Sequence, residues 1–367
     1  MAIEYDEFGP EKVLEFYDPK TKMHGFTVIH NAALGPAKGG IRFTPTVSAE
    51  EVFRLARAMS WKTALAELPF GGGKSGIIAP AGKISQQQKD EIIRAFARAT
   101  KPFVPSIYVA GPDISTTEHE MEVYAKENGN MQACTGKPKA LGGLPHELGS
   151  TGFGVYHSLR VAAEHKGMDL DKATIAIEGF GNVGWFLAKF LSENFKTKIV
   201  AVSDSKGTAY LESGMKFEEL AKVKKEKGTV TAYPKAKILG HRELFELGVD
   251  ILVPGALPDV ITMENAQKVK AKMIVEAGNI PMQEILESYF YKKGATIIPD
   301  FVANAGGVIS SWVEYVHGNE KQMFKTVEER VSRNTKKVLE RSESEGIKPR
   351  DAALGLARER IRKATKK

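Results

Sequence analysis

Residues 173–191, ATIAIEGFGNVGWFLAKFL, decide the fold of this chain. A strand-like apolar run leads into Gly-Phe-Gly-Asn-Val-Gly, and a helical apolar pattern follows at once. The next strand-like run ends in Asp204, about 20 residues after Gly184. Glycines at this spacing permit a tight turn and bring the backbone close to a pyrophosphate at the helix N-terminus. This context predicts a Rossmann-type dinucleotide site, in preference to a ligand-free glycine turn, at Gly179, Gly181, Asn182, Val183 and Gly184.

The end of the following strand bears on the choice between NAD and NADP. The carboxylate of Asp204 can accept hydrogen bonds from a ribose 2′-hydroxyl, which favours NAD. The neighbouring Ser203, Ser205 and Lys206 can hold a 2′-phosphate, which favours NADP. The sequence therefore predicts a nicotinamide dinucleotide and leaves NAD and NADP open.

Strand-like and helical segments alternate from about residue 149 to 320. The expected strands are ATIAIEGF, KIVAVSD, VDILVPGA, MIVEAG and TIIPDFVANAGG. The expected helices are STGFGVYHSLRVAAEHKG, GNVGWFLAKFLSEN, FEELAKVKKEKG, ENAQKVKA and MQEILESYFYKKG. Apolar strands separated by helices indicate a parallel sheet covered on both faces.

The first half of the chain mixes strands and helices without strict alternation. Its first long helix is expected to begin with a capping box formed by Ser48 and Glu51. From about residue 320 the pattern is helical and amphipathic, and we expect it to pack back on the first half. We therefore expect an α/β protein with two domains and a cleft between them. The domains are a substrate-binding and oligomerisation domain over 1–148, completed by helices over about 321–367, and a doubly wound, parallel Rossmann domain over 149–320.

Composition excludes several classes of protein. The longest apolar runs are strand-sized and the N-terminus lacks a signal-peptide pattern, so we expect no membrane partner and a cytoplasmic location. The single cysteine, Cys134, excludes an internal disulfide and a cysteine metal cluster, and no metal is expected. The net charge is +7, but the basic runs 222–228 and 362–367 contain no interleaved aromatic residues. We therefore expect no nucleic-acid partner.

The segment LPFGGGKSGI, residues 68–77, resembles a phosphate-binding loop but fails two of its requirements. Such a loop needs glycine where this chain has Leu68, and a helix where GIIAPAG follows. A lysine desolvated in a glycine-lined loop has a lowered pKa and can work with water as an acid or base. Lys74, with Lys62 at the edge of an apolar helix face, is therefore a candidate catalytic group, and a solvated surface charge is the alternative.

Asp113 follows a Gly-Pro turn in VAGPDIST, residues 109–116. An aspartate at such a position commonly forms a turn or caps a helix. If it faces Lys74, the two side chains form a proton-transfer pair.

These segments together resemble the glutamate/leucine/phenylalanine/valine dehydrogenase family of amino-acid dehydrogenases. The matching stretches are LGPAKGGIRF, EVFRLARAMSWKTALAELPFGGGKSGI, AGPDIST, TGFGV, GFGNVG, VPGALPDVIT, IVEAGNIP and ANAGGVISSWVEY. The resemblance implies an NAD- or NADP-dependent enzyme that interconverts an α-amino acid with its 2-oxo acid and ammonia. It also implies a closed homo-oligomer, with a hexamer expected for the glutamate branch and an octamer for the leucine branch.

By position, the resemblance also implies roles for individual residues. Lys74 would activate the water that attacks the iminium carbon, Asp113 would transfer protons, and Lys62 would bind the α-carboxylate. Thr151 and Asn304 would hold the nicotinamide carboxamide. The remaining implied contacts are Gly39 and Gly111 for the substrate, and Asp204, Ser205, Lys206, Gly255, Ala256 and Asn279 for the cofactor. Three departures from the family pattern, Ser75 for glycine, EAGN for EGAN at 276–279 and Gly255 for alanine, remove no catalytic group.

Lys38 and Ser311 bear on the choice of substrate. In the glutamate branch these positions hold a lysine and a serine that bind the γ-carboxylate, and in the other branches they are apolar. A buried ammonium facing an aliphatic side chain would be a costly unpaired charge, whereas a γ-carboxylate would accept charge-assisted hydrogen bonds. We therefore expect L-glutamate as the substrate. A leucine or branched-chain amino-acid dehydrogenase, with Lys38 directed to solvent, is the alternative.

Two other functions remain as alternatives. A hydroxy-acid dehydrogenase would need a histidine with a carboxylate partner, and none of the 8 histidines has that context in the sequence. A non-catalytic NAD-binding or nucleic-acid-binding protein would bind nucleotide without turnover.

Overall fold

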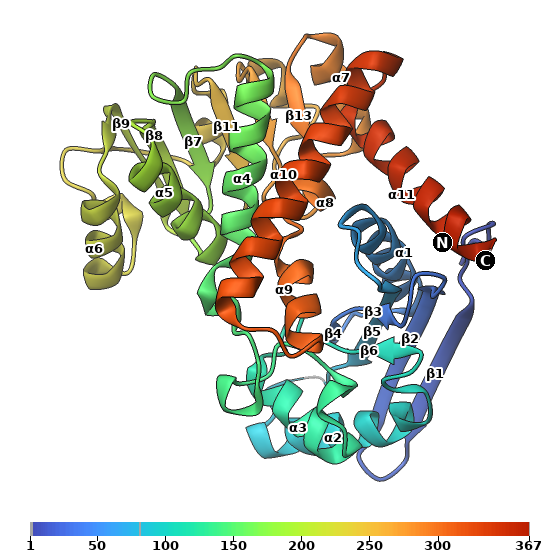
Figure 1. The fold of residues 1–367 in the computed structure, drawn as a ribbon. Coiled ribbons are helices and arrows are strands. Elements are labelled where there is room, and N and C mark those ends of the chain that lie inside the picture. Colours follow the sequence, from blue (N-terminus) through green and yellow to red (C-terminus); the bar gives the residue numbers. More distant parts are fainter. Residues whose placement is uncertain (1–2, 81, 367) are drawn as a thin grey trace. The chain divides into compact units, whose positions relative to one another are not determined.

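The computed structural model describes residues 3–80 and 82–366, and the chain divides into two compact units (Figure 1). The first unit comprises Met1–Leu148, Val308–Thr326 and Leu354–Lys367, and the second comprises Gly149–Gly307 and Val327–Ala353. The two C-terminal helices, α10 (Glu320–Glu345) and α11 (Pro349–Thr365), each contribute to both units.

This division corrects the expected role of the C-terminal segment. Residues 327–353 belong to the second unit, because α10 packs on α4 (Ser150–His165), where the Ser158 and Thr335 hydroxyls lie 2.9 Å apart. Residues 308–320, which were expected in the Rossmann domain, belong to the first unit. There the ring of Trp312 packs edge-on against that of Phe70, with the ring centroids 5.3 Å apart.

The first unit contains a mixed sheet in the order β1-β2-β5-β3-β6, with β4 also paired to β5. Its strands are β1 (Lys12–Asp18), β2 (Met23–Asn31), β3 (Ala37–Lys38), β4 (Ile41–Thr44), β5 (Gly71–Ile78) and β6 (Tyr108–Val109). The first two strands run antiparallel to their neighbours, whereas β3 and β4 run parallel to β5. The glycine-lysine segment is thus part of a central strand, and the prediction of a loop there is wrong.

The glycines of β5 allow neighbouring backbone to lie directly against this strand. A Cβ atom on Gly72 would lie 2.1 Å from the backbone nitrogen of Ser60, and one on Gly71 would lie 2.0 Å from the carbonyl oxygen of Asn31. Such close approach is one of the positional uses of glycine in a strand.

The helices of the first unit cover this sheet. They are α1 (Ala49–Leu65), α2 (Gln86–Thr100), α3 (Glu118–Asn128), the larger part of α9 (Gly306–Tyr315) and the short 3₁₀ helices Lys101–Phe103, Met131–Ala133, Lys139–Leu141 and His146–Leu148. The Ser48 hydroxyl caps α1 by accepting from the Glu51 amide at 3.2 Å. The Glu51 carboxylate contacts Arg42 at 2.5 Å, so the side-chain half of the expected capping box is not formed.

The second unit contains a seven-stranded sheet in the order β10-β9-β8-β7-β11-β12-β13. Its strands are β7 (Thr174–Glu178), β8 (Lys198–Asp204), β9 (Gly207–Met215), β10 (Lys237–Leu239), β11 (Ile251–Pro254), β12 (Met273–Val275) and β13 (Thr296–Ile298). The five neighbouring strands β8, β7, β11, β12 and β13 run parallel to one another, which confirms the predicted Rossmann-type sheet. Antiparallel β9 and β10 extend one edge and were not predicted, because their exposed residues lack a continuous apolar run.

Helices flank the strands of this second sheet. Besides α4 they are α5 (Asn182–Asn194), α6 (Phe217–Lys227), α7 (Glu284–Lys292), α8 (Asp300–Ala303) and the 3₁₀ helices Val230–Ala232, Arg242–Glu246 and Ala266–Lys268. The helix expected over 264–271 is reduced to one 3₁₀ turn. There the Asn265 side chain accepts from the Thr262 amide and donates to the Val260 carbonyl, which favours a local turn. Within residues 3–80 and 82–366, none of the helices is long and apolar enough to cross a membrane.

Candidate active site

Lys74 and Asp113, the two predicted catalytic residues, form an ion pair in the first unit. Lys74 lies on β5 and Asp113 follows β6, and the ammonium nitrogen is 2.8 Å from carboxylate oxygen Oδ2. The side chains of Lys74 and Asp113 are only 10% and 19% exposed. The Asp113 amide donates to the Thr116 hydroxyl, which donates in turn to the Ile41 carbonyl, so the turn holds the aspartate beside the sheet. The direct contact between Lys74 and Asp113 that the proton-transfer hypothesis requires is therefore present.

A second cation contacts the same carboxylate oxygen. Arg42, on β4, donates from Nε to Oδ2 of Asp113 at 3.1 Å, and its other arm contacts Glu51 at 2.5 Å. Burial raises the pKa of Asp113, but the charges and hydrogen bonds of Lys74 and Arg42 outweigh it and leave the pKa below its ordinary value. Burial also lowers the pKa of Lys74, and Asp113 only partly offsets this. The site thus holds an ionised carboxylate beside a lysine that releases its proton more readily than usual.

Lys38 is buried in the first unit, with 3% of its surface exposed. Its ammonium donates to the Ala110 carbonyl at 2.6 Å, and no carboxylate of the described residues forms an ion pair with it. Burial lowers its pKa to about 7. A Cβ atom on Gly111 would lie 2.5 Å from this ammonium, so a side chain there would displace the ammonium from its present position. The alternative of Lys38 directed to solvent therefore does not fit the structure.

Lys62 and Ser311 also lie in the first unit. Lys62 is half-buried in the last turn of α1. Ser311 is half-buried on α9, and its hydroxyl has no hydrogen-bond partner in the described part of the chain. This helix is tied to the same unit by Glu314, which is 1% exposed and accepts from Gly136, Leu144 and Lys137. The structure thus brings the five polar residues predicted for substrate chemistry into one unit, with a direct contact between Lys74 and Asp113.

The departure at Ser75 has a structural explanation. Its hydroxyl lies 2.9 Å from that of Thr27 and donates to the Tyr108 hydroxyl at 3.0 Å. Tyr108 donates in turn to the carbonyl of Gly39 at 2.8 Å. A Cβ on Gly39 would lie 1.7 Å from the Gly73 carbonyl, so this glycine lets two backbone segments meet. The extra hydroxyl of Ser75 therefore takes part in a buried hydrogen-bond network with Thr27, Tyr108 and the carbonyl of Gly39.

The glycine turn of the second unit has the geometry that the fingerprint predicts. Gly179 has a φ of 94°, and a Cβ on Gly184 would lie 2.0 Å from the Gly179 carbonyl oxygen. At Gly181 a Cβ would meet nothing within 4 Å, which leaves the backbone open at the start of α5. Val183 follows in the first turn of this helix, where the Oδ1 atom of Asn182 is buried and finds no hydrogen-bond partner in the part of the chain that the structure describes. This turn fits a pyrophosphate at the helix N-terminus.

Asn304 lies beside a loop in the same unit and presents an unused acceptor. Its amide nitrogen donates to Asn279 Oδ1 at 3.0 Å and lies 3.3 and 3.4 Å from the carbonyls of Ala277 and Gly278. Its own Oδ1 is buried and has no hydrogen-bond partner within residues 3–80 and 82–366. An orphaned amide acceptor suits the N–H group of a carboxamide such as that of nicotinamide. Thr151 lies in the first turn of α4, and its hydroxyl would be 2.9 Å from a Cβ on Gly307.

The backbone groups of Gly255 and Ala256 are held by the protein itself. Their amides donate to Oε2 of Glu178 at 2.8 and 2.7 Å. Glu178, at the end of β7, was missed by the sequence analysis, although a carboxylate directly before the glycine fingerprint was a visible signal. It fixes the loop after β11 against the glycine turn.

Asp204 is turned inward rather than toward a ligand. Its carboxylate accepts from Lys224 at 2.6 Å, the Val230 amide at 2.8 Å, the Lys206 amide at 2.9 Å and the Thr229 hydroxyl at 3.1 Å. Its side chain is only 5% exposed, whereas Ser205 and Lys206 are exposed. The four donors occupy the carboxylate oxygens that a ribose hydroxyl would need.

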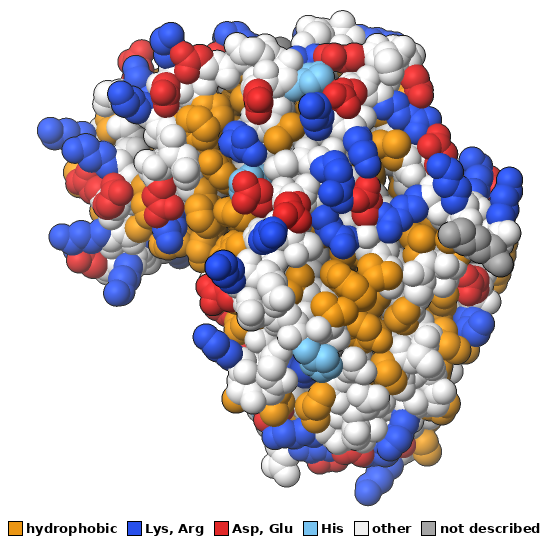
Figure 2. Space-filling view, in the orientation of Figure 1, with side chains coloured by type: hydrophobic (Ala, Val, Ile, Leu, Met, Phe, Trp, Pro, Cys, Tyr) orange, Lys and Arg blue, Asp and Glu red, His pale blue; other side chains and the backbone are white. Residues whose placement is uncertain are grey.

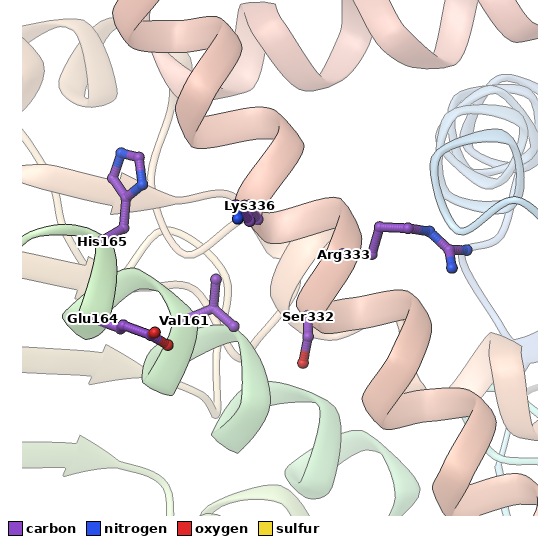
Figure 3. A pocket seen from close by; sticks show the side chains of 6 residues that line it. All are labelled: Val161, Glu164, His165, Ser332, Arg333 and Lys336. Carbon is purple, nitrogen blue, oxygen red and sulfur yellow. The ribbon is translucent and has the colours of Figure 1, made fainter.

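A cavity of about 390 Å³ lies elsewhere in the second unit, between α4 and α10 (Figure 3). It is lined by Val161, Glu164, His165, Ser332, Arg333 and Lys336. In Figure 3 the Arg333 side chain points away from the α4 residues, and none of the predicted site residues lines the cavity. We therefore do not assign the active site to it.

The face shown in Figure 2 mixes cationic and anionic side chains over α10 rather than gathering cations alone. A nucleic-acid surface typically has its Lys and Arg side chains clustered on one face or along a helix.

Comparisons with known proteins agree with this arrangement. A family model described as Glutamate/Leucine/Phenylalanine/Valine dehydrogenase matches residues 142–367, and one described as its dimerisation domain matches residues 10–130. The glutamate dehydrogenase of Aeropyrum pernix is 41% identical over 93% of this chain and 86% of its own. The NADP-specific glutamate dehydrogenase of Saccharolobus shibatae is 38% identical over 84% of this chain and 76% of its own. The hetero-hexameric glutamate dehydrogenase of Thermus thermophilus, in a leucine-bound form, superposes with a TM-score of 0.85 at 29% identity, covering 97% of this chain and 89% of that one.

Proposed function

This chain belongs to the glutamate/leucine/phenylalanine/valine dehydrogenase family, and we propose that it catalyses the reversible oxidative deamination of L-glutamate. The reaction is L-glutamate, water and NAD(P)+ to 2-oxoglutarate, ammonium, NAD(P)H and a proton. The proposal is supported by relatives that carry the name glutamate dehydrogenase.

The observation that carries the choice of glutamate is the environment of Lys38. A buried ammonium that has only a backbone carbonyl as partner needs an anion to offset its desolvation. The γ-carboxylate of glutamate supplies this charge, and the unused hydroxyl of Ser311 supplies a second donor for it. Lys62 takes the α-carboxylate. An aliphatic substrate would leave the buried ammonium without a counter-charge.

Lys74 and Asp113 handle the protons of the reaction. A bound NAD(P)+ would supply the acceptor for the hydride of the α-carbon. Lys74, with its lowered pKa, takes a proton from the water that adds to the iminium carbon. Asp113, whose pKa is lowered, is ionised before the step and can therefore accept a proton from the amino nitrogen and return it. Its carboxylate contacts both Lys74 and Arg42.

The residues of the second unit fit a nicotinamide dinucleotide. The glycine turn would hold the pyrophosphate, and Asn304 with Thr151 would hold the carboxamide. For the adenosine ribose we propose that NADP is used at least as well as NAD. The Asp204 carboxylate is already occupied, while exposed Ser205 and Lys206 are able to meet a 2′-phosphate.

We also propose a cytoplasmic homo-oligomer, with a hexamer expected. The match of residues 10–130 to a dimerisation domain supports self-association, and the Thermus thermophilus neighbour, a hetero-hexamer, supports six as the number of subunits.

The test is the rate of absorbance change of the nicotinamide with glutamate and with leucine, each paired with NAD+ and with NADP+. Turnover with glutamate and little with leucine is the expected result. Faster turnover with leucine would contradict the assignment of Lys38 to the substrate pocket. Nucleotide binding without turnover of either amino acid would overturn the proposed enzyme function.

A further inference from the structure

The two oxygens of the Asp113 carboxylate have unequal surroundings. Both Lys74 Nζ and Arg42 Nε contact Oδ2, at 2.8 and 3.1 Å. Oδ1 receives no donor from the described residues. Two cations on one oxygen therefore orient the carboxylate and leave the other oxygen open.

Arg42 is itself held in place from two sides. Its Nε bonds to Asp113 and its terminal nitrogen contacts Glu51, and the side chain is 18% exposed. On β4, Arg42 pairs in register with Gly76 of β5, two residues beyond Lys74. Glu51 lies in the first turn of α1, where its amide is bound by the Ser48 cap. A sheet and a capped helix together fix the guanidinium.

The charges around Asp113 change during the reaction, but the charge of Arg42 does not. When Lys74 gives up its proton, Asp113 loses the positive charge of its nearest partner. Tyr108 on β6 cannot replace it, because burial raises the pKa of its hydroxyl and keeps it neutral. Guanidinium stays protonated at any working pH, so Arg42 remains a counter-ion throughout.

We propose that Arg42, braced by Glu51, is a positioning residue for the proton-transfer step: it holds Oδ2 of Asp113 against Lys74 and leaves Oδ1 as the oxygen that exchanges protons with the substrate. The inference rests on the proposed function and assigns to it a residue that the sequence analysis did not single out. A charged residue between buried Ile41 and Phe43 was the available signal.

The test compares Arg42→Met and Arg42→Lys with wild type in the full-length enzyme. The substrate is whichever of glutamate and leucine the wild type turns over faster. We expect Arg42→Met to lower kcat on the order of 10²-fold with a small change in KM, because the carboxylate is no longer held in its reactive orientation. The acid limb of the kcat–pH profile should move to higher pH, because burial of Asp113 is then opposed by Lys74 alone. Arg42→Lys retains a cation, so its acid limb should stay near that of wild type.

Two further variants separate positioning from general destabilisation. Glu51→Gln removes a negative charge from the same cluster, so its acid limb should move to lower pH or stay in place, opposite to Arg42→Met. Arg57→Met removes an ion pair with Asp6 from the far side of α1 and should change neither kcat nor the pH profile. Unchanged subunit assembly and NADPH binding confirm that each variant is folded.

An acid limb that does not move in Arg42→Met, or that moves to higher pH in both Arg42→Met and Glu51→Gln, overturns the inference alone. If Arg42→Met does not fold, the other two variants decide. An acid limb that moves to higher pH in Glu51→Gln or in Arg42→Lys then overturns the inference. A wild type inactive with both amino acids overturns the proposed function and this inference with it.

Discussion

At the scale of the residue, the proposed contact between Lys38 and the substrate predicts that substrate binding depends on pH. Burial lowers the pKa of Lys38 to about 7, so the ammonium that we propose as the partner of the γ-carboxylate is present below this pH and is lost above it. We expect the KM for glutamate to rise as the pH increases above 7, by at most about tenfold per pH unit. Initial rates over a range of glutamate concentrations from pH 6 to 9 measure this.

The Lys38→Met variant checks that the pH dependence comes from this side chain. It should raise the KM for glutamate by about 10- to 100-fold at pH 6.5, since a charge-assisted hydrogen bond contributes about 1.5–3 kcal/mol. The increase in KM above pH 7 should also be lost. Lys139→Met, at an exposed position in the same unit, is the control. A variant with the wild-type pH dependence would show that another group controls binding.

A second residue-scale prediction concerns Lys206. We expect Lys206→Ala to raise the KM for NADP+ by about tenfold, because one charge-assisted contact to the 2′-phosphate is lost, and to leave the KM for NAD+ unchanged. Lys222→Ala, on α6 of the same unit, is the control. Equal effects on both cofactors would show that Lys206 does not face the 2′-phosphate.

The two site predictions at this scale had different outcomes for a physical reason. The Lys74–Asp113 contact could be anticipated, since both residues lie in segments with specific patterns. The hydrogen bonds that hold the Asp204 carboxylate inside the protein could not be anticipated. Three of its four donors lie 20–26 residues further along the chain, in α6 and the turn after it.

At the scale of the element, α11 is tied to the segment that carries Asn279 and Asn304. Arg350, in the first turn of this helix, contacts Glu276 at 2.9 Å, Glu287 at 2.5 Å and Asp300 at 3.0 Å. Glu276 follows β12 and Asp300 begins α8, so this one guanidinium contacts the chain on both sides of the loop that carries Asn279. Three carboxylates face one arginine, and Oε1 of Glu276 is buried with no hydrogen-bond partner among the described residues.

This cluster should make the stability of the fold fall as the pH rises. Burial raises the pKa of Glu287 to about 7 despite Arg350 and Lys348, from an ordinary value of 4.5. Between pH 4.5 and 7 the folded state keeps a proton that the unfolded state releases, so this group favours unfolding by up to about 1.4 kcal/mol per pH unit. We expect Glu287→Gln to flatten the fall in melting temperature across this window relative to wild type. Glu284→Gln, at an exposed position on the same helix, should leave the fall in melting temperature unchanged. If the melting temperature falls equally steeply with pH in wild type and both variants, the prediction is contradicted.

The elements themselves were predicted unevenly. Buried parallel strands such as β7 and β11 were predictable, because they are short apolar runs next to turn glycines. The strand character of Gly71–Ser75 was not predictable, because glycine has no side chain from which a two-residue periodicity can be recognised. This segment pairs with β2, β3 and β4, which come from other parts of the chain.

At the scale of the whole molecule, the residues proposed for the substrate and those proposed for the dinucleotide fall in different units. Asn304 and Ser311 are close in sequence, yet the division passes between Gly307 and Val308, within α9. Residues 300–307 were expected to continue a strand, but β13 ends at Ile298 and the helices α8 and α9 follow, so the sequence pattern contained no signal for this division. It depends on tertiary contacts such as those of Trp312 with Phe70 and of Glu314 with Lys137.

The central claim is that a buried Lys38 and the hydroxyl of Ser311 select glutamate. The most direct measurement is the ratio of kcat/KM for glutamate to kcat/KM for leucine, in wild type and in the Lys38→Leu/Ser311→Val variant. We predict a ratio far above 1 in wild type and below 1 in the variant, because an apolar pocket rejects the γ-carboxylate and accepts the aliphatic side chain. A variant that remains active and keeps the wild-type preference for glutamate would contradict the account.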